Sequence, residues 1–198
     1  MEEKELIRQI KKLKKEKNAV ILAHVYQRPE IYKVADFIGD SFGLSKKATE
    51  TDAEIIVFCG VDFMAESAYI LNPEKMVLIP SKMANCPMAA MVDVFGLRKL
   101  KVKHPKAAVV SYVNTTADVK AESDVCCTSA NAVKVVNSLK EEEVIFVPDS
   151  NLANYVMRHT SKKIIPWNGW CYVHNKFSPE GLHCAKAKHI NTLTLNNI

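Results

Sequence analysis

The sequence predicts an α/β fold in which a unit of parallel strands and intervening helices is repeated along the chain. The composition is that of a folded protein, with 48% apolar and 25% charged residues and only 6 Gly and 8 Pro among 198 positions. Short apolar stretches alternate with helical segments, which is typical of parallel sheets covered by helices. The chain also matches itself at an offset of 88 residues, which predicts two complete repeats.

The N-terminal segment 1–18 is predicted to form a solvated amphipathic helix. Lys and Arg dominate it, and its apolar residues recur at helical spacing, namely Leu6, Ile7, Ile10 and Leu13. This segment carries much of the formal net charge of +5. No helix-turn-helix, zinc-finger or RNA-binding pattern accompanies the charge, so we expect no nucleic-acid partner. A mild positive field suits small anionic substrates instead.

The repeat aligns residues 19–47 with residues 107–135 without a gap. Five of these 29 pairs are identical, one of them Asp36 with Asp124. In each copy an apolar strand ends in polar or aromatic residues, and a short helical segment leads to a turn with a hydroxyl residue before another helix. We therefore expect a first repeat at 19–106, a second at 107–190, and the opening strand of a third at 191–198.

The same register continues through a second strand and a helix in each repeat, because residues 55–69 lie over residues 143–157, and a third strand follows in each copy at an offset of 86. One cysteine follows the third strand of each copy, Cys86 in the first and Cys171 in the second. In a chain without a secretion signal, such cysteines favour metal binding or catalysis over disulfides. Cys86 and Cys171 are therefore candidate metal ligands, whereas Cys59 is expected to be a small buried strand residue.

Polar side chains follow the first strand of each repeat, where ligands bind in parallel sheets. His24 and Tyr26 follow the strand of the first repeat, and Tyr112 and Asn114 follow that of the second. Two hydroxyls in matching register fall at predicted helix N-termini, where backbone N–H groups favour carboxylate or phosphate: Ser41 and Ser129. The shared register predicts one anion site built from both repeats.

No apolar stretch approaches the roughly 18 to 20 residues that span a bilayer. The N-terminal segment also lacks the apolar core and cleavage site of a signal peptide. We therefore expect a cytoplasmic protein with no membrane partner.

The motifs resemble those of one family, quinolinate synthase A, the iron–sulfur enzyme of NAD biosynthesis. The resemblance rests on ILAHVYQRPEIYKVADFIGDSFGLS, NCPMA, SYVNTTADVKAESDVCCTSANAVKVV, FVPDSNLANYV and WNGWCYVH, in that order. It implies three homologous three-layer αβα domains, each giving one cysteine to a 4Fe-4S cluster. It also implies that iminoaspartate condenses with dihydroxyacetone phosphate to give quinolinate, with an L-aspartate-oxidising enzyme as the supplier of iminoaspartate.

Residue roles follow from the resemblance at matching motif positions. Tyr26 and His174 are implied as catalytic residues, the first for proton transfer and the second facing the cluster. Cys86 and Cys171 are implied as cluster ligands. The residues implied to bind iminoaspartate are His24, Ser41, Tyr112, Val113, Asn114 and Ser129.

The resemblance also implies a third domain, whose opening motif and third cysteine ligand are absent from this sequence. We therefore expect a truncated family member with two complete repeats of three. It is an enzyme by family, but an inactive fragment with weak iron or anion binding is the alternative. Cys184 is a poor substitute ligand, because it falls on a helix predicted at 178–188. A thiol-redox or zinc-binding module is disfavoured, because the sequence contains no CxxC pair.

Overall fold

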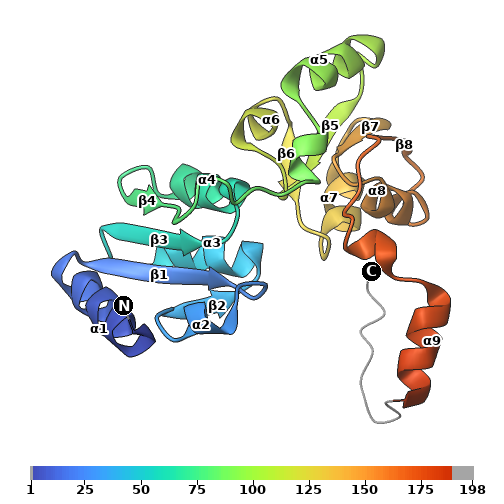
Figure 1. Cartoon of the computed structure of the whole chain (residues 1–198). Helices are drawn as coiled ribbons and strands as arrows, with labels where there is room; N and C mark the ends of the chain where they lie inside the picture. The colour runs from blue at the N-terminus through green and yellow to red at the C-terminus, as the bar shows by residue number, and fades with distance from the viewer. Residues whose placement is uncertain (1, 189–198) are drawn as a thin grey trace. The chain divides into compact units, whose positions relative to one another are not determined.

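The computed structural model describes residues 2–188, and the chain divides between Cys86 and Pro87 into two compact units (Figure 1). We call them unit 1 and unit 2. Each contains one four-stranded parallel sheet with helices packed on it. The predicted α/β fold with two repeated domains is confirmed.

Unit 1 is formed by four helices and four strands among the described residues. They are α1 (Glu3–Glu16), β1 (Ala19–His24), α2 (Pro29–Tyr32), β2 (Phe37–Gly39), α3 (Ser41–Glu50), β3 (Ile55–Cys59), α4 (Asp62–Leu71) and β4 (Met76–Leu78). The strand order is β2-β1-β3-β4, and every neighbouring pair is parallel. Strand β1 is an almost continuous apolar run because helices cover both faces of the sheet. Figure 1 shows α1 and α4 on opposite sides of this sheet.

Unit 2 repeats this arrangement. Its elements are η1 (Ala89–Met91), α5 (Val94–Lys103), β5 (Ala108–Tyr112), α6 (Ala117–Ala121), β6 (Val125–Cys127), α7 (Ala132–Ser138), β7 (Glu143–Val147), α8 (Ser150–Met157), β8 (Lys163–Pro166), η2 (His174–Lys176) and α9 (Pro179–Lys188). The strand order β6-β5-β7-β8 has the same topology as the order in unit 1.

The sheet of unit 2 has an apolar layer on each face. Val110, Val144 and Phe146 pack with residues of α7 and α8. The alternate strand residues, among them Val109 and Ile145, pack with residues of α5 and α6. Because successive strand side chains point to opposite faces, the two layers make unit 2 a three-layer αβα domain.

Equivalent hydrogen bonds show that the two units are structural repeats. The Asp36 carboxylate accepts from the backbone N–H of Ile21 over 2.8 Å, and the Asp124 carboxylate accepts from that of Val109 over 2.7 Å. In each pair the backbone N–H of the aspartate also donates to the carbonyl of the strand residue, over 2.8 and 3.0 Å. Asp36 and Asp124 are therefore identical because each ties a turn to the first strand of its unit.

Helices α1 and α5 also occupy equivalent places. Each precedes the first strand of its unit, and each carries a lysine whose Nζ donates to a loop carbonyl. Lys14 donates to Val34 over 3.5 Å, and Lys101 donates to Glu122 over 2.9 Å. The compact units thus begin one helix earlier than the repeat limits of 19 and 107 that the sequence match suggested. The physical reason is that each helix packs on the sheet that follows it in the chain.

Some local expectations differ from the structure. Strands β2 and β6 have three residues each, in segments predicted as turns. In α1, Leu6 and Leu13 are exposed and only half of the apolar stripe packs on the unit. The strand expected at 191–198 lies outside the described residues. Within residues 2–188, no helix has the length and apolarity that a membrane span requires.

Candidate functional site

The polar residues predicted at the strand ends lie at the carboxyl edge of each sheet. His24 ends β1 and Tyr112 ends β5. In each unit the following strand pairs on one side of this strand and the strand after that pairs on its other side, so the strand order reverses direction at β1 and at β5. Open parallel sheets bind their ligands at such switch points. The predicted site residues therefore occupy the place in each unit where a ligand is expected.

His24 is buried, with 7% of its surface exposed. Burial lowers the pKa of His24, and the negative charge of Asp40 opposes this shift. The backbone N–H of Tyr26 donates to Nδ1 of His24 over 3.2 Å, so the neutral ring carries its proton on Nε2. His24 is thus a neutral imidazole near neutral pH, with an Nε2–H that can donate to an anion.

Tyr26 and Ser41 lie close to His24 along the same edge of unit 1. The Tyr26 ring meets the His24 ring edge-on, with 4.8 Å between centroids, and 80% of Tyr26 is exposed. Ser41 is the first residue of α3, which follows the strand end paired with His24. The cap of α3 is Asp40, whose carboxylate accepts from the Gly43 N–H over 2.6 Å. Ser41 therefore adds its hydroxyl to the first turn of a capped ten-residue helix.

In unit 2, Tyr112, Val113 and Asn114 follow one another at the end of β5. Tyr112 packs partly buried against the apolar layer under α7 and α8. The N–H of Val113 already donates to the carbonyl of Cys127 over 2.8 Å. The side-chain oxygen of Asn114 is buried, and it makes no hydrogen bond with any of the described residues. A buried acceptor without a protein donor indicates a place for a polar ligand.

Ser129 differs from its expected position. It is exposed in a turn, and α7 begins three residues later at Ala132 with Asn131 as the cap residue. The Asn131 side-chain oxygen accepts from the backbone N–H and the hydroxyl of Thr128, over 2.7 and 3.0 Å. Ser129 is therefore not in the first turn of a helix as Ser41 is, because this local turn delays the start of α7.

Each candidate cysteine is held by an equivalent backbone hydrogen bond. The N–H of Asp62, at the start of α4, donates to the carbonyl of Ala84 over 2.9 Å. The N–H of Ser150, at the start of α8, donates to the carbonyl of Gly169 over 2.7 Å. Ala84 and Gly169 both lie two residues before the cysteine of their unit. The two loops thus present their cysteines at the carboxyl edge of their own sheet.

His174 lies one helical turn after Cys171. The backbone N–H of Asn175 donates to the carbonyl of Cys171 over 2.9 Å, which winds the chain into a turn leading to η2. Both side chains are half-buried. The structure therefore brings this pair together within unit 2, as their spacing of three residues predicts.

The remaining strand cysteines are poor thiolate ligands. Burial raises the pKa of Cys59, and it raises the pKa of Cys127 to about 12 with a further contribution from the neighbouring Cys126. Burial also raises the pKa of Cys126, although Lys120 opposes this shift. Metal ligation needs the deprotonated thiolate, so these three cysteines are disfavoured.

Thiolates are the right donors for an iron–sulfur cluster, and both candidate loops supply one. Across residues 2–188, however, no group of three or more His, Cys, Asp or Glu side chains could hold a metal ion. The donor type fits the expected cluster, and the number of donors is below the three cysteines that the resemblance implies.

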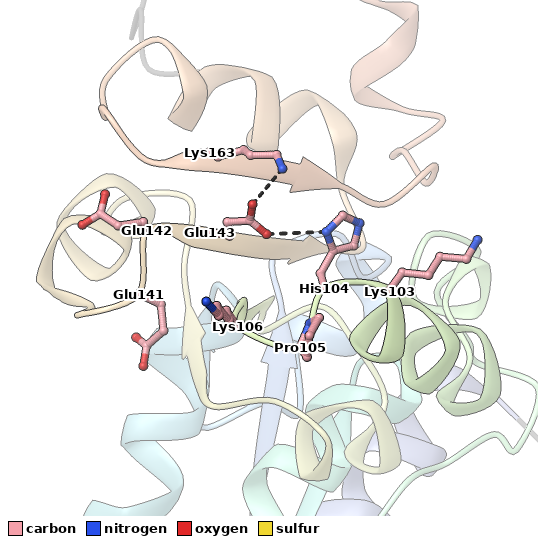
Figure 2. Close-up of a pocket in the computed structure, with 8 residues that line it drawn as sticks. All are labelled: Lys103, His104, Pro105, Lys106, Glu141, Glu142, Glu143 and Lys163. Carbon is pink, nitrogen blue, oxygen red and sulfur yellow. Dashed lines mark hydrogen bonds and ion pairs between the residues drawn. The ribbon is translucent and has the colours of Figure 1, made fainter.

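A pocket of about 740 Å³ lies at the opposite edge of unit 2, where β5, β7 and β8 begin. Figure 2 shows that Glu143 points toward His104 and Lys163, with contacts of 3.5 and 2.7 Å. Glu141 and Glu142 point in other directions. The pocket therefore has neither converging carboxylates nor a connection to the predicted site residues.

Asp40, at the carboxyl edge of the unit 1 sheet, is a site residue that the sequence prediction missed. It caps α3 and its charge acts on His24. The pattern of an aspartate three residues before Gly43 is typical of a helix N-cap and could have identified it.

The family model described as NadA, quinolinate synthetase A protein, matches residues 8–196. The chain belongs to the quinolinate synthase family. It is 59% identical over 189 residues to quinolinate synthase 1 of Methanosarcina acetivorans and 60% identical over 189 residues to quinolinate synthase of Methanosarcina barkeri. Each alignment covers 96% of this chain and 62% of the relative. Quinolinate synthase of Methanoregula boonei is 57% identical over 181 residues, 91% of this chain and 60% of that protein. The chain therefore spans about three-fifths of the length of these relatives.

Proposed function

We propose that this chain supplies two of the three domains of a quinolinate synthase, which condenses iminoaspartate with dihydroxyacetone phosphate to quinolinate at a 4Fe-4S cluster in NAD biosynthesis. Family membership supports the reaction, and the fold supports the location of the site. The observation that carries the proposal is the buried, unpartnered Asn114 oxygen at the switch point of unit 2. A dicarboxylic imine offers an N–H donor that such an acceptor needs.

His24 would bind a substrate carboxylate. A neutral imidazole with its proton on Nε2 donates one hydrogen bond without bringing a charge into the site. A bound carboxylate would favour protonation and so raise the lowered pKa of His24. The N–H contact from Tyr26 fixes the ring orientation in advance, which reduces the entropy lost on binding.

Ser41 and Tyr26 would complete this half of the site. The hydroxyl of Ser41 lies in the first turn of α3, where backbone N–H groups and the helix dipole favour an anion. The Tyr26 hydroxyl belongs to a ring that is exposed on one side and held by His24 on the other. It could therefore move a proton at the triose, as general acid–base chemistry requires.

In unit 2, Tyr112, Val113, Asn114 and Ser129 would bind iminoaspartate, and His174 would face the cluster. The N–H of Val113 is occupied by Cys127, so Val113 would contribute its carbonyl or side chain.

Cys86 and Cys171 would hold the cluster, with a third cysteine from outside this chain. When bound, such a cluster supplies an iron with an open position that acts as a Lewis acid on a leaving hydroxyl. We further propose a cytoplasmic location and iminoaspartate supply by an L-aspartate-oxidising enzyme.

The alternative is an inactive fragment that folds but does not turn over. It is favoured for the chain on its own because the two predicted cysteine ligands are fewer than the three that the resemblance implies. The test is an anaerobic assay of quinolinate formation by the reconstituted chain, alone and mixed with a polypeptide that spans the remaining length of a relative. The proposal expects product in the mixture. An equally inactive mixture that contains loaded cluster would support the fragment.

A substrate-site test does not depend on turnover. We expect calorimetry to detect binding of aspartate, a stable dicarboxylate whose ammonium group offers N–H donors, to the wild-type chain and a loss of about tenfold in Asn114→Ala, because the ligand's donor then has no acceptor. Asn137→Ala, in an exposed side chain on α7, is the matched control. Equal binding by the wild type and both variants would remove Asn114 from the site.

A further inference from the structure

The loop that carries Cys171 is fastened to the first segment of unit 2. The indole Nε1–H of Trp167 donates to the carbonyl of Met91 over 2.8 Å. The backbone N–H of Trp170 donates to the sulfur of the same methionine over 3.4 Å. Two contacts from one loop thus converge on Met91, the last residue of η1.

Gly169 lies between these two tryptophans, in a space that admits no side chain. A Cβ at Gly169 would lie 2.5 Å from the carbonyl oxygen of Pro148 and 3.3 Å from Cβ of Met91. The first distance is much shorter than a van der Waals contact, and the atom it meets belongs to the backbone. Replacing Gly169 even with alanine would therefore displace the loop. The carbonyl of Gly169 also accepts from Ser150 at the start of α8. The loop is therefore packed closely between the start of α8 and Met91.

The Trp167 ring is held from its other side by α5. A Cβ added at Gly96 would lie 2.7 Å from the far edge of this ring, and Trp167 packs against the apolar layer that includes Leu97. Gly96 therefore leaves room for the ring that reaches Met91. Ring packing and a hydrogen bond together give Trp167 a single position.

Unit 1 lacks this arrangement at the equivalent loop. There the link to α4 is the hydrogen bond from Asp62, and Ala84 stands where unit 2 has Gly169. The backbone hydrogen bond from the start of the following helix is thus common to both repeats, whereas the contacts of Trp167, Gly169 and Met91 belong to unit 2. If these contacts served only to stabilise the fold of one unit, we would expect equivalent contacts in the other unit.

We propose that Trp167, Gly169 and Met91 form a clasp that positions the Cys171 thiol for its metal. The contacts of the clasp extend to the backbone of Trp170, the residue before Cys171. These contacts therefore restrain the chain immediately before Cys171. The inference rests on the proposed function in taking Cys171 as a ligand, but the geometry of the clasp does not.

The test compares Trp167→Phe with Trp170→Phe in the full chain. The first variant keeps an aromatic ring and loses the N–H to Met91. The second makes the same change three residues later, in a ring that is 38% exposed and joins the clasp only through its backbone. Mass spectrometry measures alkylation rates of individual cysteines, with exposed Cys184 as internal reference and buried Cys127 as a check of folding.

We expect Trp167→Phe to raise the Cys171 alkylation rate about fivefold, which corresponds to the loss of one ordinary hydrogen bond, while Trp170→Phe stays within about twofold of wild type. Cys184 keeps its rate and Cys127 stays unreactive. Gly169→Ala is the second variant and changes the Cys171 rate in the same direction. Equal Cys171 rates in the wild type and in both clasp variants, with Cys127 unreactive, would overturn the clasp.

Iron uptake separates the clasp from the proposed function. After anaerobic reconstitution together with a polypeptide that spans the remaining length of a relative, the clasp predicts that Trp167→Phe binds less iron per chain than Trp170→Phe. Iron uptake that is equal in both, with Cys171 alkylation altered, would show that the clasp does not serve a metal. If the wild type binds no iron while Cys171 alkylation still differs between the variants, the cluster assignment fails and the positioning role stands.

Discussion

The paired aspartates Asp36 and Asp124 allow the repeat to be tested quantitatively. Asp124→Ala removes the acceptor of the Val109 N–H, at a strand residue that is fully buried. A hydrogen bond to a charged group contributes ~1.5–3 kcal/mol. Because Asp124 itself is partly hydrated, we take the lower end and expect a loss of about 1.5 kcal/mol. Asp124→Asn keeps an oxygen acceptor and should lose less than half as much.

Asp36→Ala should cost more than Asp124→Ala. Asp36 accepts from Ile21 and also pairs with Lys14 over 2.6 Å, where both side chains are mostly covered. A pair of this kind adds ~0.5–1 kcal/mol. Urea unfolding of the three single variants measures these differences, and hydrogen exchange at the Val109 amide reports the local effect. A loss below about 0.5 kcal/mol in Asp124→Ala, with unchanged exchange at Val109, would refute the role of the aspartates.

The remaining predictions concern the core, the thiols and the pH dependence. Phe146→Ala should destabilise unit 2 by about 4 kcal/mol in urea unfolding, because the ring is fully buried, whereas exposed Phe95→Ala should change little. Cys127, whose pKa burial raises to about 12, should resist alkylation at about pH 8 until the chain unfolds, and early labelling would contradict its burial. The pKa of His24 lies below its ordinary 6.5, so unfolding binds a proton and stability should fall as pH drops below 6.5. In urea unfolding, His24→Gln should lose the part of the pH dependence of stability that His24 causes. Identical pH profiles of stability for the wild type and His24→Gln would contradict this prediction.

The repeat, the parallel sheets and the central strands could be predicted because their apolar runs recur at the same or nearly the same offset. The edge strands β2 and β6 could not, because three residues at an edge show no periodicity. The identity of Asp36 and Asp124 was visible in the sequence, but its cause is a hydrogen bond to a strand residue 15 positions earlier. Such partners become known only when the turn is placed beside the strand.

In the candidate site, too, some features could be predicted from the sequence and others depend on the folded structure. His24, Tyr112 and Asn114 could be placed at strand ends from sequence order alone. Helix starts were less certain, because Asp40 caps α3 whereas the Thr128–Asn131 turn delays α7 and leaves Ser129 exposed. The clasp could not be predicted, because Trp167 and Met91 are 76 residues apart and only the folded unit brings them together.

Iron binding by single-cysteine variants tests the central claim, that Cys86 and Cys171 are the metal ligands of this member of the quinolinate synthase family. The chain is reconstituted anaerobically with iron and sulfide together with a polypeptide that spans the remaining length of a relative, and iron per chain is measured for the wild type, Cys86→Ala, Cys171→Ala and the exposed control Cys184→Ala. We predict that the first two variants lose most of the iron and that the control keeps it. Unchanged iron in Cys86→Ala and Cys171→Ala, or a loss confined to Cys184→Ala, would contradict the account.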